Sequence, residues 1–225
     1  MCGRIAQFAT ADELANQFTA EFPLTKIDQH YNGAPTQTFA IVTERRDRRV
    51  ELMRWGLIPF WAKEKSIGNR LINARAETVP SKPSFRSAFK QRRCIVPVNG
   101  FFEWKKTEEG KTPHYITSPT DQLLAFAGLH ESWNDPELAA DAPPLNTFTI
   151  ITTAANDFMT PLHDRMPLLL IGAEIDAWLN NGTPGNDLEM LLKHDINNDL
   201  LQAWPVSRAV NSPRNDLPEI IEKIA

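Results

Sequence analysis

The chain has 225 residues, of which 42% are apolar and 23% are charged, and its formal net charge is −4 at neutral pH. These values are typical of an ordinary globular protein and predict one domain over residues 1–225. No run of about 18 apolar residues occurs, and the amino terminus lacks a signal-peptide core. The sequence therefore argues against a membrane-spanning helix or a secreted protein, and we expect a cytoplasmic one.

Cysteine and histidine usage argues against a metal centre and against a disulfide framework. Cys2 and Cys94 are the two cysteines, too few for either kind of framework. The five histidines have no spacing typical of metal ligands. We expect no metal and no cofactor, and we expect Cys94, inside the apolar stretch 93–98, to be a buried strand residue.

Charge is distributed unevenly along the chain. Residues 62–93 contain nine Lys or Arg and two Glu, a net charge of +7, whereas residues 131–200 carry a net charge of −10. A molecule with one basic end can bind phosphates there although its total charge is negative. A solvated charged surface explains the same composition, and composition alone does not decide between the two.

The elements expected in chain order begin with a helix after Thr10, because Thr10 and Glu13 form a capping box and Leu14 and Phe18 follow at helical spacing. Strands are expected at 39–43, 49–55, 93–98, 101–105, 114–118, 123–129, 147–153 and 201–206, helices at 173–179 and 188–194, and an exposed loop at 136–144. Strands that cluster disfavour a doubly wound parallel sheet. The sequence predicts a single α+β domain with a predominantly antiparallel, barrel-like β core and peripheral helices.

Cys2 is a candidate for covalent chemistry, because removal of Met1 would leave its α-amine and thiol on adjacent carbons. A neutral amine condenses with an aldehyde to an imine, and the thiol can then close a five-membered thiazolidine ring. An amine with a pKa near 8 is partly neutral at neutral pH. Positive charge favours the thiolate, and Arg4 lies two residues away. The alternative is that Cys2 is incidental.

Polar residues in two further segments are candidates for contacts to a sugar and its phosphates. Asn73 and Arg75 are two residues apart in an extended segment, so their side chains point the same way. Together they could bind a sugar edge and a phosphate, and Arg86 follows nearby. A structural role at an exposed strand end is the alternative.

Two titratable residues have surroundings that suit proton transfer. Glu103 stands between the aromatic residues Phe102 and Trp104, and burial beside them would raise its pKa. Strand alternation favours a different arrangement, with Glu103 facing water. His163 precedes Asp164 in a polar segment between apolar runs and could shuttle protons, although a lone histidine is more often structural.

Gly56 and Pro59 interrupt the segment 54–61 and are expected to expose Phe60 and Trp61. Exposed aromatic rings beside a basic region can stack on unpaired bases or act as a wedge. Trp55 is expected in the core.

These segments, in this order, resemble the SRAP family of SOS-response-associated peptidases, also called abasic-site processing proteins. The matching pieces are Met1–Arg4, Tyr31–Pro35, Arg54–Trp61, Asn73–Arg75, Gly100–Trp104, His163–Pro167 and Pro205–Ser207. Gly33 departs from the pattern, since the family usually has an apolar residue there.

The resemblance implies a compact domain with a groove for single-stranded DNA and a Cys2 that crosslinks to the opened sugar of an abasic site. It implies active-site roles for Asn73, Glu103 and His163, and it adds lyase and peptidase character. Phosphate contacts are implied for Arg4, Arg75 and Arg86. We expect a monomer that associates with the nucleoid when bound to DNA.

Two other functions remain open at this stage. One is a cysteine peptidase with the Cys2 thiolate as nucleophile and His163 as base. The other is a non-covalent module that binds single-stranded DNA by stacking.

Overall fold

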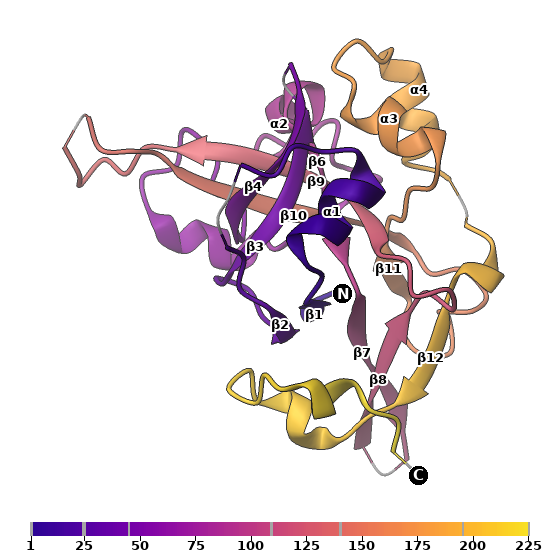
Figure 1. The fold of residues 1–225 in the computed structure, drawn as a ribbon. Helices are drawn as coiled ribbons and strands as arrows, with labels where there is room; N and C mark the ends of the chain where they lie inside the picture. The colour runs from indigo at the N-terminus through magenta and orange to yellow at the C-terminus, as the bar shows by residue number, and fades with distance from the viewer. Residues whose placement is uncertain are drawn as a thin grey trace.

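Strand β10 (Leu145–Ala154) lies at the centre of the computed structural model and pairs with four described strands (Figure 1). The structure describes residues 2–23, 26–44, 46–108, 110–139, 141–194 and 196–224. Along one edge β10 pairs in parallel with β4 (Arg48–Trp55) and then with β5 (Asn73–Arg75). Along the other edge it pairs antiparallel with β9 (Leu124–Trp133) and then with β11 (Arg165–Pro167).

Five strands close a barrel in the order β10-β4-β3-β6-β9 and back to β10. The other four strands are β3 (Thr38–Glu44), β4 (Arg48–Trp55), β6 (Arg93–Val98) and β9 (Leu124–Trp133). Every neighbouring pair is antiparallel except β4 with β10. Closure removes the unpaired edges that an open sheet would leave. The prediction of a predominantly antiparallel, barrel-like core is confirmed.

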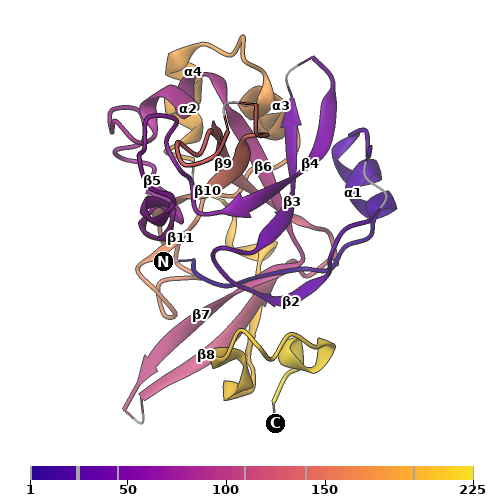
Figure 2. The same ribbon diagram turned by 90° about the vertical axis from the view of Figure 1, so that its left-hand side faces the viewer.

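A second, antiparallel sheet lies against one end of the barrel and supplies part of the site. Its order is β12 (Gln202–Pro205), β8 (Gly110–Thr117), β7 (Gly100–Thr107), β1 (Ile5–Gln7) and β2 (His30–Gly33). The hairpin of β7 and β8 projects away from the barrel (Figure 2).

Helices lie at the periphery, as predicted (Figure 1). They are α1 (Ala11–Phe18), α2 (Arg86–Gln91), α3 (Ala173–Leu179) and α4 (Gly185–Leu191). Short 3-10 helices form η1 (Lys65–Arg70), η2 (Asn198–Leu200), η3 (Arg208–Asn211) and η4 (Pro218–Ile221). The two remaining short strands are β5 (Asn73–Arg75) and β11 (Arg165–Pro167). The capping box of α1 is present, with Thr10 N donating to Glu13 Oε2 at 2.7 Å. The last predicted helix was placed three residues too late, because α4 begins directly after Pro184. No described helix is long and apolar enough to cross a membrane.

Alternate residues of the barrel strands fill its interior, and the intervening ones pack beneath the helices. Phe39, Trp55 and Phe148 meet inside at ring-centroid distances of 5.9–6.2 Å. The expectations that Trp55 and Cys94 are core residues are confirmed, since both are fully buried. A Cβ on Gly33 would lie 2.6 Å from the Phe39 ring, so this ring explains why a larger side chain is missing at position 33.

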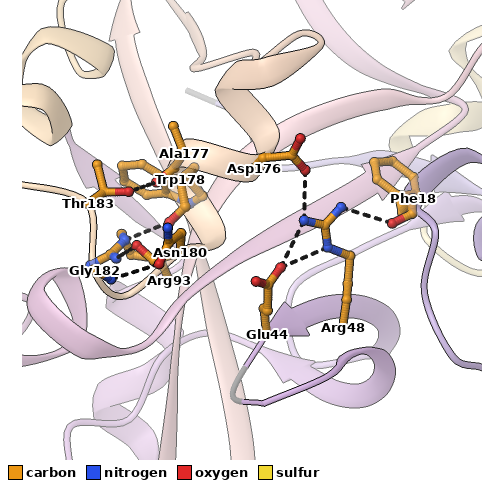
Figure 3. Close-up of polar contacts among 10 residues, drawn as sticks. All are labelled: Phe18, Glu44, Arg48, Arg93, Asp176, Ala177, Trp178, Asn180, Gly182 and Thr183. Carbon is orange, nitrogen blue, oxygen red and sulfur yellow. Dashed lines mark hydrogen bonds and ion pairs between the residues drawn. The ribbon is translucent and has the colours of Figure 1, made fainter.

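Arg93 ties the carboxyl ends of two helices to the barrel (Figure 3). Its guanidinium donates to the carbonyls of Phe89, Trp178 and Asn180 at 2.6–2.8 Å, and the residue is only 2% exposed. A cation at a helix carboxyl end satisfies carbonyls that have no partner within the helix. In the same view, Arg48 binds Asp176 at 2.7 Å and so joins β4 to α3.

We predict that Arg93→Met lowers the free energy of unfolding by about 3–5 kcal/mol, because each buried carbonyl left without a donor costs about 1–3 kcal/mol. Urea unfolding followed by circular dichroism measures this loss. The control is Arg49→Met, since Arg49 is 44% exposed and its ion pairs are 3.8 and 4.0 Å long. A change within about 0.5 kcal/mol is expected there. Equal losses in the two variants would contradict the role assigned to Arg93.

Candidate functional site

Cys2 lies at one end of the barrel, immediately before β1, and its side chain is fully buried in the cluster that fills the barrel interior. Asn73 Nδ2 donates to the Cys2 carbonyl at 2.7 Å. Phe102 N donates to the Arg4 carbonyl at 3.0 Å, which attaches the same segment to β7. Cys2 is thus held between β5 of one sheet system and β7 of the other.

Glu103 reaches this position from β7 and is almost fully buried, with 3% exposed. Strand alternation alone favoured a solvent-facing Glu103, and that alternative is wrong. The sheet carries packing on both sides, so both faces of β7 are covered at this point. Burial raises the pKa of the Glu103 carboxyl above its usual range, and the neighbouring His163 acts in the opposite direction.

His163 lies in the turn between β10 and β11, with 28% of its side chain exposed. Arg165 N donates to His163 Nδ1 at 3.0 Å. Asp164 Oδ1 lies 2.8 Å from the same Nδ1. This nitrogen therefore has one neighbour that donates and one that accepts.

A pocket of about 670 Å³ opens onto Glu103 and His163. Its other lining residues are Trp104, Lys106, Lys111, Thr160, Pro161, Leu162 and Asp164. Asn73 Oδ1 is buried and has no hydrogen-bond partner within the described part of the chain. A ligand hydroxyl or an ammonium group could supply the missing donor.

Arg4 acts on the Cys2 thiol through its backbone and not, as expected, through its charge. Burial raises the pKa of the Cys2 thiol and the charge of Glu103 raises it further, whereas a hydrogen bond from the Arg4 backbone lowers it. Arg4 Nη1 instead donates to Asn32 Oδ1 and to the Val210 carbonyl, both at 2.7 Å. The Arg4 side chain therefore anchors the segment that follows Cys2.

The other predicted contact residues lie outside the cluster around Cys2. Arg75 is exposed at the end of β5, and Arg86 is exposed at the start of α2. Phe60 and Trp61 are exposed by 60% and 49%, which confirms that the segment after β4 presents them to solvent. Trp133 Nε1 donates to the Ala62 carbonyl at 2.7 Å and holds this segment in place.

One ion pair that sequence reasoning missed joins the segments carrying Asn73 and His163. The Arg165 guanidinium binds both carboxylate oxygens of Glu77 and donates to the Thr152 carbonyl at 2.6 Å. A signal was available, because Glu77 and Arg165 are oppositely charged and each belongs to a segment with a predicted site residue. Within the described residues, no group of three or more His, Cys, Asp or Glu side chains is placed to hold a metal ion.

Comparison with known proteins identifies relatives along the whole chain. The chain is 42% identical over 226 residues to "Abasic site processing protein YoqW" of Bacillus subtilis (strain 168), with 99% of both chains covered. It is 30% identical over 268 residues to "Abasic site processing protein HMCES" of Xenopus tropicalis, which covers all of this chain and 78% of that protein.

Solved structures and a family model agree with these relatives. A crystal structure of a protein from Bacteroides thetaiotaomicron superposes with a TM-score of 0.88 at 28% identity, over the full length of both chains. The family model described as "SOS response associated peptidase (SRAP)" matches residues 1–213. The chain therefore belongs to the SOS response associated peptidase (SRAP) family.

Proposed function

We propose that this protein recognises abasic sites in single-stranded DNA and bonds to them covalently through Cys2, once the residue before Cys2 has been removed. The observation that carries the proposal is the convergence of Cys2, Asn73, Glu103 and His163 at one end of the barrel from four separate segments. The relatives named as abasic site processing proteins support the same substrate.

The reaction would proceed in three steps: addition, loss of water and ring closure. The Cys2 amine attacks C1′ of the open-chain aldehyde and gives a carbinolamine. Loss of water, assisted by proton donation to the departing hydroxyl, gives an imine. The Cys2 sulfur then adds to the imine carbon while the thiol proton passes to the nitrogen, and a thiazolidine ring closes. If the imine persists instead, β-elimination would cleave the strand, which is the lyase activity expected of the family.

The residues around Cys2 suit these steps. A carboxyl whose pKa is raised by burial, such as Glu103, keeps a protonated fraction that can donate to the departing hydroxyl. His163 lines the same pocket as Glu103 and is the second candidate for this transfer. Asn73 holds the Cys2 carbonyl and would orient the sugar through its Oδ1 atom.

The cysteine-peptidase alternative has less support. A peptidase nucleophile must be a thiolate, and thiol groups that act in this way have lowered pKa values. Burial and the Glu103 charge raise the pKa of the Cys2 thiol. A protonated thiol suits the imine route, because the amine attacks first and the sulfur follows.

We propose further that Arg75 and Arg86 contact phosphates flanking the lesion and that Phe60 and Trp61 stack on unpaired bases. Arg4, also expected to contact a phosphate, is bound to Asn32 and the Val210 carbonyl and would instead hold the segment that carries Cys2. An abasic nucleotide has no base to unstack, so placing its sugar in a pocket costs little. The monomeric state and association with the nucleoid stay predictions.

We predict that purified protein forms a band of reduced mobility with an abasic single-stranded oligonucleotide on a denaturing gel, because a covalent bond survives denaturation. Cys2→Ala should abolish the band, and Cys94→Ala should retain it, since Cys94 lies inside β6 and its nitrogen is a peptide amide that cannot form an imine. Protein that keeps Met1 should also fail, because its Cys2 nitrogen is an amide. A band of full intensity from Cys2→Ala would refute the proposal, and salt-sensitive binding without any band would favour the non-covalent module.

We predict that Glu103→Gln slows crosslinking by about 10²–10⁴, the usual contribution of general acid–base catalysis, and makes the protein more stable above neutral pH. The pKa of Glu103 in the folded state lies above its value in the unfolded state. The free energy of unfolding of the wild type therefore falls as the pH rises from the unfolded-state pKa through the folded-state pKa. Glutamine has no charge to desolvate. Urea unfolding at about pH 4 and about pH 8 should show the advantage at the higher pH.

Glu77→Gln is the matched control. The hydrogen bonds from Arg165 lower the pKa of Glu77, so its stabilising effect is present at neutral pH and lost in acid. The variant should therefore be less stable than the wild type at about pH 8, with a deficit that shrinks on acidification. The same pH dependence in both variants would contradict the assigned environments.

A further inference from the structure

Two lysines face each other across the projecting hairpin of β7 and β8. Lys106 is the direct pairing partner of Lys111 in the antiparallel ladder. Side chains paired in this way have Cβ atoms about 5 Å apart, and like charges directly opposite each other destabilise the pair. The repulsion can be relieved by an anion bound between the two ammonium groups.

Both lysines line the same pocket as Glu103 and His163. Among the described residues, neither lysine has a carboxylate within ion-pair distance, whereas Asp164 at the pocket rim lies 2.8 Å from His163. Lys106 and Lys111 therefore bring positive charge to a pocket that the proposed chemistry already uses, and the described chain does not neutralise it through an ion pair.

The ladder fixes how far this charge lies from the reacting groups. Pairing is continuous from Glu103 opposite His114 to Thr107 opposite Gly110. Lys106 is three residues beyond Glu103, a distance of about 10 Å along an extended strand. The lysine pair lies beside the position where a sugar would react, farther out on the hairpin that Figure 2 shows projecting from the barrel.

We infer that Lys106 and Lys111 form a binding site for a backbone phosphate of the DNA strand, next to the nucleotide whose sugar reaches Cys2. The inference rests on the proposed function and adds a contact on the hairpin to those proposed for Arg75 and Arg86. Each ammonium group has three donors, so the pair can bind one phosphate from two sides.

The test measures non-covalent affinity, with Cys2→Ala as the background so that no crosslink forms. Fluorescence anisotropy of a labelled abasic single-stranded oligonucleotide is recorded over a range of salt concentrations. Replacing both lysines by alanine should weaken binding at about 50 mM salt on the order of tenfold. It should also reduce the slope of log K against log salt by about 0.7, the contribution of one phosphate contact on a single strand.

The control removes the same charge elsewhere, in Lys26→Ala/Lys105→Ala. Lys105 is on β7 but pairs with Thr112 and does not line the pocket, and Lys26 is exposed beside Asp28. The control should leave the slope nearly unchanged. Equal slopes for the lysine-pair variant and the control would overturn the inference. Thermal unfolding should show the lysine-pair variant at least as stable as the wild type, because a like-charge pair has been removed.

A second measurement uses the wild-type Cys2 background. The lysine-pair variant should require a higher DNA concentration for half-maximal crosslinking, with an unchanged rate at saturation. A lower saturating rate at unchanged half-saturation would place the lysines in the chemistry and overturn the inference. The affinity measurement needs no crosslink, so absence of crosslinking by the wild type would refute the proposed function and leave the phosphate site to be decided by the salt slope.

Discussion

The structure depends on how the two edges of β10 are shared between the barrel and the site. β4 and β9 occupy the edges up to about residue 150, and β5 and β11 occupy them from there to residue 154. The pairing of Ile150 with Asn73 places Asn73 against the Cys2 carbonyl. The pairing of Ala154 with Arg165 brings the turn that carries His163 to the same end. A slip of one residue on either edge would turn these side chains to the other face.

The two buried charged residues Arg93 and Glu103 have different roles. Burial lowers the pKa of Arg93 as well, but its guanidinium is buried among carbonyls that need donors, and these hydrogen bonds join α2 and α3 to the barrel. Glu103 is buried where desolvation outweighs its favourable contacts, as the raised pKa shows. A carboxyl that costs stability while sharing a pocket with His163 is the pattern expected of a group kept for chemistry.

The negative net charge does not show which cationic side chains are exposed and which are bound within the chain. Arg75 and Arg86, both within the segment 62–93, are exposed, whereas Arg4 and Arg93 are bound within the chain. Net charge and charge per segment therefore overstate the cations available to a phosphate, because they count buried arginines with exposed ones. The projecting hairpin adds two lysines that the count over residues 62–93 did not include.

The amino-acid sequence by itself determined the elements whose signal is local. Side-chain periodicity and capping involve residues close in the chain, and they predicted the long strands, the Thr10 capping box and the helix at 173–179. The predicted loop at 136–144 lies on the surface at residues 136–139 and 141–144, and residue 140 lies outside the described residues. The ordered segments from Cys2 to Ser207 also identified the family. The extent of one domain to residue 225 stays a prediction.

Tertiary structure alone decided the rest. Strands as short as β1, β5 and β11 have too few residues to show a period, and they form because β7 and β10 offer them an edge. Three features of the site depend on residues far apart in sequence. They are the burial of Glu103, the hydrogen bond from the Arg4 guanidinium to Asn32, and the ion pair of Glu77 with Arg165. Sequence could name the chemical groups, but their pKa values and partners depend on distances that exist only after the barrel has closed.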